Sequence, residues 1–164
     1  MRLAFVNHEI PQEDVTVEIV STTLAHIREL NANLREADRK EIEVYGMSAK
    51  KGVWLSYKTG LGNKTGLING RVAACWGCGG AYLGRVGRPW LLSTDQVYKI
   101  SPLKFARIYQ KEVRKMLKLF PVLVNWVADD YEEAKRLLQI VGFTLGEPEQ
   151  LGAGGWYRKF SMEA

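Results

Sequence analysis

The clearest pattern of apolar and polar residues lies in residues 121–143. Residues 122–127 are almost entirely apolar, and their length is typical of a strand buried on both faces. Asp129 and Asp130 follow, and acidic residues at this point are expected to cap a helix. Apolar residues then recur at helical spacing among charged ones: Ala134, Leu137, Leu138 and Val141. Gly142 is placed to end the helix, so the pattern predicts a strand, a turn and a helix, with a new strand at residues 143–145.

The N-terminal part gives weaker signals. Residues 1–14 are acidic, contain a proline and are expected to form an N-terminal arm. Residues 15–20 alternate as a strand does. Apolar residues at helical spacing follow to about residue 46, as one helix or two. Residues 47–60 fit a strand or a short helix equally well.

In the middle and at the end of the chain, turn-forming residues separate the predicted elements. Asn69-Gly70 is the strongest hairpin signal and is expected to join two strands. Glycines predict a loop over residues 77–87, and residues 90–94 are expected to form the next strand. Ser101-Pro102 is a typical helix start. Residues 146–155 are expected to form a loop before a closing strand, residues 156–162.

Composition fits one soluble domain. The chain has 164 residues, 46% hydrophobic and 25% charged, which is enough for a real core. No apolar run approaches the ~20 residues that span a bilayer, so no membrane association is expected. The N-terminus is too polar for a signal peptide, and cytosolic synthesis is the expectation.

The cysteine pair, the positive charge and the tryptophans are each interpreted as structural features and not as a functional site. Cys75 and Cys78 form a lone Cys-x-x-Cys with no second pair to complete a zinc site, so two buried thiols and no metal are expected. The net charge of +5 permits contact with nucleic acid but does not show it, because the positive charge is spread along the chain. The five tryptophans are expected in the core or at a partner surface rather than stacked on bases.

The order of predicted elements resembles the GNAT (N-acetyltransferase) fold. Four fragments also resemble small GNAT-like proteins of tailed phages, related to internal virion proteins of short-tailed phages. They are ANLREADRKEI, NGRVAACWG, PWLLSTDQVYKIS and the strand-helix-Gly-Phe unit at residues 121–143. The resemblance implies a single α/β domain over residues 15–164. Its mixed sheet has six to seven strands with helices on both faces, and its fourth and fifth strands are parallel and splayed.

The resemblance implies an acetyl-CoA site, but this sequence departs from its motifs. The loop that would hold the pyrophosphate, residues 93–105, has no glycine, and Pro102 lacks an N–H group. Tyr131 stands where the family often has asparagine, and Leu138 where it often has a catalytic tyrosine. If acetyl-CoA binds, the candidate contacts are Leu92, Ser93, Thr94, Lys99, Lys104 and Tyr131. Candidate general bases are Glu18, Glu43 and Asp95, each better interpreted as a surface carboxylate.

Three function classes therefore stay open, of which a basic nucleic-acid-associated module is supported by charge alone. The first is a virion-associated or assembly protein of a phage with degenerate catalytic motifs, no cofactor and no catalytic residue. It would act in the host cytoplasm or in the virion, with other phage structural proteins as partners and self-association left open. Its expected partner surface comprises Tyr82, Leu83, Arg85, Arg88, Arg107, Lys111 and Arg114. The alternative is an acetyl-CoA-dependent N-acyltransferase acting on a protein or small-molecule amine.

Overall fold

The computed structural model describes residues 14–80, 84–152 and 154–164. In this part of the chain, one mixed sheet has the strand order β1-β2-β3-β4-β5-β7-β6. Its strands are β1 (Val17–Ser21), β2 (Gly60–Ile68), β3 (Arg71–Gly80), β4 (Val86–Ser93), β5 (Val122–Ala128), β6 (Thr144–Leu151) and β7 (Gly155–Glu163). The α-helices are α1 (Leu24–Asn33), α2 (Glu36–Glu43), α3 (Ala49–Thr59), α4 (Pro102–Leu119) and α5 (Glu132–Val141), and Asp95–Lys99 form a 3-10 helix, η1.

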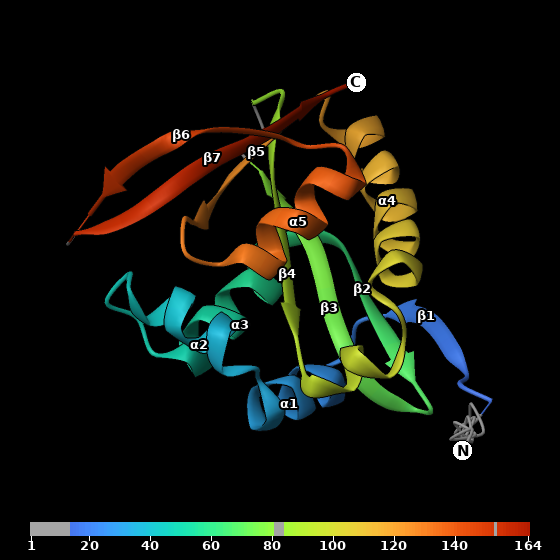
Figure 1. The fold of residues 1–164 in the computed structure, drawn as a ribbon. Helices are drawn as coiled ribbons and strands as arrows, with labels where there is room; N and C mark the ends of the chain where they lie inside the picture. Colours follow the sequence, from blue (N-terminus) through green and yellow to red (C-terminus); the bar gives the residue numbers. More distant parts are fainter. Residues whose placement is uncertain (1–13, 81–83, 153) are drawn as a thin grey trace, which may run out of the picture.

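Helices cover both faces of the sheet, as expected (Figure 1). On one face, Ile27 and Leu30 of α1 and Val53 of α3 pack with Val72 and Cys75 of β3. On the other face, the buried residues of α4 and α5 form a larger cluster with β3, β5 and β7. The N-terminal arm, residues 1–14, lies outside the described residues except for Asp14.

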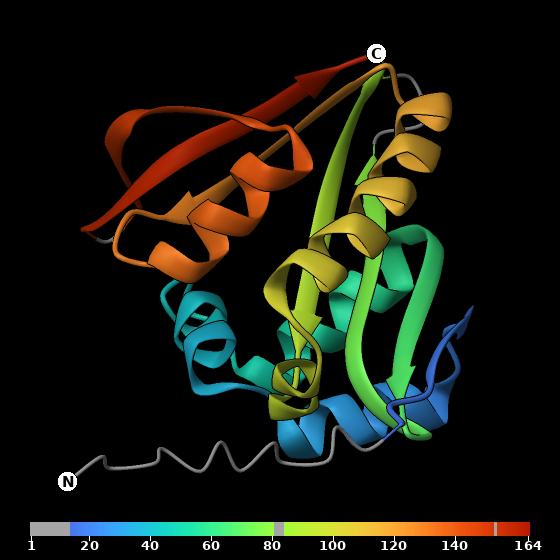
Figure 2. The same cartoon turned by 45° about the vertical axis from the view of Figure 1, so that its right-hand side comes forward.

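Strands β4 and β5 are parallel and diverge, which confirms the predicted splay. They pair only through Val86 with Val122 and Gly87 with Leu123. Helix α4 makes the connection between them, as a parallel pair requires. Figure 2 shows the two strands meeting at one end of the molecule and separating toward the other. The gap between them is the feature around which the rest of the chain is arranged.

Local sequence explains several element ends. The Ser101 hydroxyl accepts a hydrogen bond from the Lys104 N–H at the start of α4, and Pro102 occupies the first helical position. Gly142 ends α5 with a φ of 117°, a conformation that favours glycine. Asn69 and Gly70 both have positive φ and close the β2–β3 turn.

The glycine-rich stretch at residues 77–87 is mostly strand, so the predicted loop was too long. Strand β3 continues to Gly80, which pairs with Gly87 of β4. A Cβ atom on either glycine would lie 2.5–2.8 Å from the Phe120 ring. These glycines therefore let an aromatic side chain pack on the backbone of a hairpin and do not indicate a turn.

The predicted loop at residues 146–155 was also wrong. Residues 144–151 form β6, which pairs antiparallel with β7. Pro148 lies within β6, and the register shifts between Leu145 and Pro148. Since β6 is at the edge of the sheet, Pro148 can lack an N–H group without breaking a hydrogen bond to a neighbouring strand. The undecided residues 47–60 form α3, capped by the Ser48 hydroxyl.

One further prediction about side chains was wrong. Asp129 and Asp130 do not cap α5. The N-cap is Tyr131, with no side-chain cap, and Asp129 pairs with Arg158 and Lys135 instead.

The tryptophans lie apart from the larger core at two positions. Phe143, Leu138 and Val141 lie in that core, but Trp126 is only partly buried and Trp90 packs on the opposite face. Successive strand residues point to opposite faces, which places both tryptophans away from Phe143.

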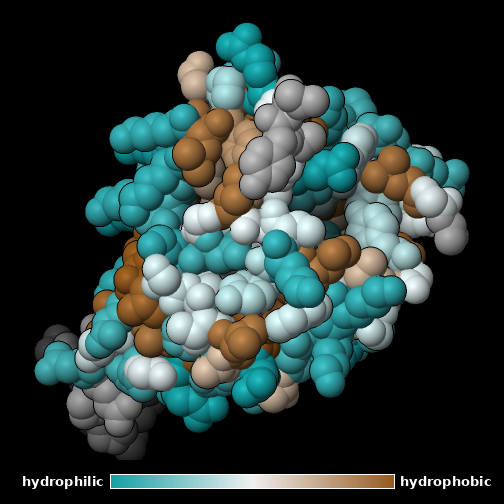
Figure 3. Space-filling model, turned by 180° about the vertical axis from the view of Figure 1, so that it is seen from behind, coloured by the Kyte–Doolittle hydropathy of each residue, from teal (hydrophilic) through white to brown (hydrophobic). Residues whose placement is uncertain are grey.

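The surface mixes polar and apolar residues. Figure 3 shows one face of the molecule, with hydrophilic residues over much of it and hydrophobic residues among them. Among the described residues, no helix is long and apolar enough to cross a membrane.

Candidate functional site

The splay between β4 and β5 opens into a cleft of about 960 Å³. Its walls come from α2, α3, β4, η1, α4, β5 and α5, so it extends between both helical layers. A cleft of this size, mostly apolar with a few polar groups, is typical of a small-molecule site. The polar side chains that lie in it define its chemistry.

The first of these is Glu41, at the end of α2. Its Oε1 atom accepts a hydrogen bond from the Ala128 N–H at the end of β5, at 3.0 Å. Burial raises the pKa of this carboxyl to about 7, and Asp38 and Asp130 add to the rise, while the Ala128 hydrogen bond and Arg35 oppose it. A carboxyl that titrates near neutral pH is suited to general-base work. Glu41 is thus the strongest catalytic candidate in the cleft.

The second group is a polar cluster that joins α2 to η1 and α5. Arg35 donates hydrogen bonds to Tyr131 Oη at 2.6 Å and to Glu133 at 2.9 Å, and it pairs with Asp38. Tyr131 Oη in turn donates to Asp38. Tyr98 Oη accepts from Arg35 and donates to Glu133. Burial raises the pKa of Tyr131 and the Asp38 carboxylate raises it further, so the phenol stays protonated.

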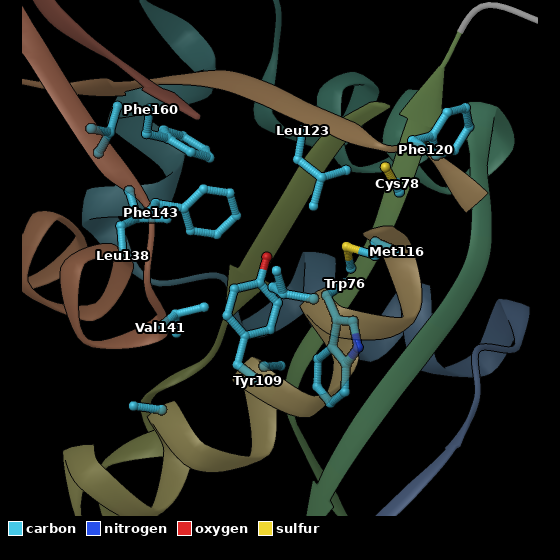
Figure 4. Packing of buried hydrophobic residues seen from close by; sticks show 14 residues of the cluster. Trp76, Cys78, Tyr109, Met116, Phe120, Leu123, Leu138, Val141, Phe143 and Phe160 are labelled. Atoms are coloured by element: carbon cyan, nitrogen blue, oxygen red, sulfur yellow. The ribbon is translucent and has the colours of Figure 1, made fainter. Parts of the chain in front are cut away.

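The third group is Tyr109, which lies on α4 and lines the cleft. Figure 4 shows its oxygen directed toward the space between the Leu123 and Phe143 side chains. Among the described residues no hydrogen bond to this hydroxyl is present, and burial raises its pKa, so it remains a proton donor at neutral pH. The family resemblance places a proton donor at the position of Leu138, whose side chain cannot donate a proton. Tyr109 was missed because it belongs to a different helix.

The two sides of the cleft differ in character. On the α2–α3 side, its lining includes Glu41 and the aromatic residues Tyr45, Trp90 and Trp126. On the α4–α5 side, the lining is largely apolar and includes Phe105, Leu137 and Ile140. One side is therefore suited to a polar or cationic group next to aromatic rings, and the other to an extended apolar chain.

The structure separates the predicted cofactor contacts. Leu92, Ser93 and Tyr131 line the cleft. Thr94 is buried beside it, where its hydroxyl donates to the Val72 carbonyl. Lys99 and Lys104 are exposed and do not line the cleft. Tyr131 precedes the first turn of α5, and its hydroxyl lies in the polar cluster.

The predicted bases are not in the site. Glu18, Glu43 and Asp95 are all exposed and do not line the cleft, in agreement with their interpretation as surface carboxylates. Glu41, two residues from Glu43, was missed. Its sequence neighbours give no signal of burial, and only the position of β5 beside α2 shows that it lies in the cleft.

The two cysteines have no redox or metal arrangement. Cys75 packs in the α1–α3 cluster and Cys78 in the α4–α5 cluster, because residues three apart in a strand point to opposite faces. Burial raises the pKa of both thiols to about 11. Within the described ranges no group of three or more metal-ligating side chains is present.

The expected partner residues fall in three places. Arg85 and Arg88 are exposed near the start of β4, and Arg88 also lines the cleft. Arg107, Lys111 and Arg114 are exposed on α4. Tyr82 and Leu83 lie outside the described residues.

Comparison with known proteins identifies the fold. No protein-family model and no curated protein sequence matches the chain. Ribosomal-protein-S18-alanine N-acetyltransferase from Escherichia coli is similar in structure, with a TM-score of 0.63, 15% identity, and 90% of this chain and 94% of that chain covered. A GNAT-family acetyltransferase from Streptococcus pneumoniae has a TM-score of 0.61 at 12% identity, with 91% and 100% covered.

A spermidine N-acetyltransferase chimera from Vibrio cholerae and hSSAT gives a TM-score of 0.64 at 9% identity, with 90% of this chain and 95% of that chain covered. At such identities the likeness shows the fold alone. The chain is a single α/β domain with the GNAT fold, and its structural neighbours are acetyltransferases. Acyl transfer is therefore the chemistry to test against the residues of the cleft.

Proposed function

We propose that the protein is an N-acyltransferase that moves an acyl group from a thioester to an amine. The observation that carries the proposal is Glu41, a carboxyl in the cleft with its pKa raised to about 7. The GNAT fold and its acetyltransferase neighbours support the same reaction class. Acetyl-CoA is the donor that these neighbours suggest.

The reaction assigns one role to each side of the cleft. The amine enters beside Tyr45, Trp90 and Trp126, and Glu41 takes its proton as the nitrogen attacks the thioester carbonyl. A C–N bond forms and the C–S bond breaks. Tyr109 gives a proton to the departing thiolate, and Glu41 later returns a proton to the phenolate through solvent. The apolar α4–α5 side holds the thioester arm.

The test is thiol release from acetyl-CoA and from S-acetyl-pantetheine at millimolar concentration, across a panel of amines. We expect Glu41→Gln to lower kcat by about 10²-fold or more at pH 7, since the amide cannot accept the proton. Tyr109→Phe should lower kcat with a smaller change in KM. Glu43→Gln is the matched control, because this exposed neighbour on the same helix should leave the rate unchanged.

A pH profile adds a second readout. The rate should rise through about pH 7 as Glu41 ionises, and Glu41→Gln should remove that rise. Burial is the main cause of the raised pKa of Glu41, and the Ala128 N–H, Asp38, Asp130 and Arg35 modify it. No thiol release with any donor and amine, or equal rates in wild type and Glu41→Gln, would contradict the proposal.

A role in phage virion assembly remains a second proposal, based on sequence resemblance. No observation in the described residues or in the comparisons favours it over acyl transfer. Its direct test is whether purified particles contain this chain.

A further inference from the structure

The end of the cleft beside η1 and α4 offers few donors for phosphate. The Thr94 hydroxyl accepts from the Gln96 N–H, and the Ser101 hydroxyl accepts from the Lys104 N–H. Further N–H groups in this segment donate to backbone carbonyls: Val97, Ile100 and Phe105. Pro102 has no N–H group. A pyrophosphate needs several converging backbone N–H groups, and here five of the N–H groups in this segment already donate to the protein's own oxygens.

Charge at this end replaces the missing donors only in part. Glu132 and Glu133 lie in the first turn of α5, where an anion would otherwise be favoured, and both line the cleft. Glu132 pairs with Lys135, and Glu133 and Asp38 pair with Arg35, whereas Arg136 lines the cleft and makes no salt bridge among the described residues. The thioester arm of acetyl-CoA fits the apolar side of the cleft, whereas its pyrophosphate would meet few free backbone N–H groups.

A positive surface begins at the same end of α4. Five exposed side chains follow at intervals of three or four residues: Lys104, Arg107, Lys111, Arg114 and Lys118. At about 100° per residue they fall within about 80° of the helix circumference and extend about 21 Å. Among the described residues, none of these five makes a salt bridge. We call this surface the α4 basic face.

The α4 basic face and the cleft share the first turns of α4. Pro102 and Phe105 line the cleft, and Lys104 and Arg107 start the basic face between and beyond them. At about 100° per residue, the residues of α4 that line the cleft lie on the opposite side of the helix, so an arm from a macromolecule bound along the α4 basic face would reach the cleft past the N-terminal end of α4. Complementary charge requires that macromolecule to be acidic.

We propose that the natural acyl donor is a thioester on a pantetheine-type arm of an acidic carrier protein, and that this carrier docks on the α4 basic face. The inference rests on the proposed function and names its donor. The amine nitrogen forms a bond to the acyl carbon, the C–S bond breaks, and the thiol stays on the arm of the carrier. The cleft binds the arm and acyl group, while the α4 basic face supplies the contacts that a nucleotide would otherwise make.

The experiment compares one acyl group on two carriers. Acetyl-CoA and an acetylated holo acyl carrier protein of acidic composition are offered with the best amine from the panel. We expect kcat/KM for the carrier protein to exceed that for acetyl-CoA by about tenfold or more, and to fall steeply as salt is raised. Binding of the carrier protein is measured separately by calorimetry, so that the result does not depend on turnover alone.

Charge reversal tests the surface. Arg107→Glu with Lys111→Glu should raise KM for the acyl carrier protein by about tenfold or more while kcat changes little. The same variant should leave KM for acetyl-CoA unchanged. Lys50→Glu with Lys51→Glu on α3 is the matched control, since both are exposed and lie on another face. Circular dichroism and thermal unfolding confirm that each variant folds.

The outcomes separate the two proposals. Turnover of acetyl-CoA equal to or better than that of the carrier protein overturns the carrier proposal and leaves N-acyl transfer standing. No turnover of either donor, with no carrier binding, overturns both. Binding of duplex DNA that Arg107→Glu with Lys111→Glu abolishes, without carrier binding, assigns the α4 basic face to nucleic acid and overturns the carrier proposal.

Discussion

At the scale of single residues, the environment of Glu41 decides its chemistry. Glu41 and Glu43 lie two residues apart on α2, yet Glu43 is exposed and Glu41 accepts a hydrogen bond from β5. The raised pKa of Glu41 means that its ionised form is less stable in the folded protein than in the unfolded chain. A residue held in this state for function should reduce stability at neutral pH.

Glu41→Gln should therefore stabilise the protein in a pH-dependent way. The pKa rises from the ordinary 4.5 to about 7 on folding. Between these values the folded state holds a proton that the unfolded state has lost, so stability falls as pH rises through this window. The variant should be more stable than wild type by up to about 3 kcal/mol at pH 8, and nearly equal to it at pH 4.5. Urea unfolding at both pH values measures this, and an equal stability at pH 8 would contradict it.

Phe143 shows how much the burial of one apolar side chain contributes to the free energy of unfolding. Its side chain is 4% exposed, and its ring meets Phe160 edge-on at a centroid distance of 5.0 Å. Phe143→Ala should cost about 3–5 kcal/mol, because it removes buried area and leaves a cavity. Leu119→Ala, at an exposed position on α4, is the control. A loss below about 1 kcal/mol for Phe143→Ala in denaturant unfolding would exclude this packing.

At the scale of elements, the polar cluster around Arg35 ties α2 to α5 and η1. The side chains of Arg35 and Asp38 are 11% and 4% exposed, so the pair is largely shielded from water. By contrast, the Arg39–Glu36 pair on the same helix is exposed and measures 3.7 Å. The two pairs allow a matched comparison of a buried and an exposed ion pair.

Arg35→Ala should cost about 3–5 kcal/mol, because it leaves Asp38 buried without its partner. Arg39→Ala should cost less than about 1 kcal/mol. Thermal or urea unfolding gives both values, and hydrogen exchange should show the start of α5 less protected in Arg35→Ala. If the double variant Arg35→Ala, Asp38→Ala is no more stable than Arg35→Ala, the cost does not arise from an unpaired carboxylate.

Elements with local signals were predictable from sequence, and those defined by distant contacts were not. The Asn69-Gly70 hairpin, the Ser101-Pro102 helix start and the Gly142 helix end follow from backbone preferences that neighbouring residues already show. The glycines at the end of β3 and the start of β4 were interpreted as loop, because Phe120 packs on them from 33 to 40 residues away along the chain. The site was missed for the same reason. Glu41 and Tyr109 acquire their roles only when α2, α4 and β5 come together.

At the scale of the whole molecule, the cleft and the surface charge favour a donor other than a free nucleotide. We expect acetyl-CoA turnover to be weak, with kcat/KM below the ordinary enzymatic range of about 10⁴–10⁸ M⁻¹s⁻¹. The reasons are the occupied N–H groups before α4 and the glutamates at the start of α5. Steady-state thiol release over the amine panel measures it. An ordinary rate with acetyl-CoA would show that the nucleotide finds contacts elsewhere.

The short contact between β4 and β5 has a consequence for how the molecule holds together. Among the described residues, only two ladder pairs join β4 to β5, while β5 and β7 pair along their length, and the β1–β4 and β5–β7 parts otherwise meet through the larger core and through side chains. The ladder between β4 and β5 is therefore expected to open at a lower free energy than either part needs to unfold. A thioester arm lying between the strands would contact both parts at once. The bound substrate would then act as a reversible cross-link, so the free energy needed to separate the two parts should be highest while substrate is bound.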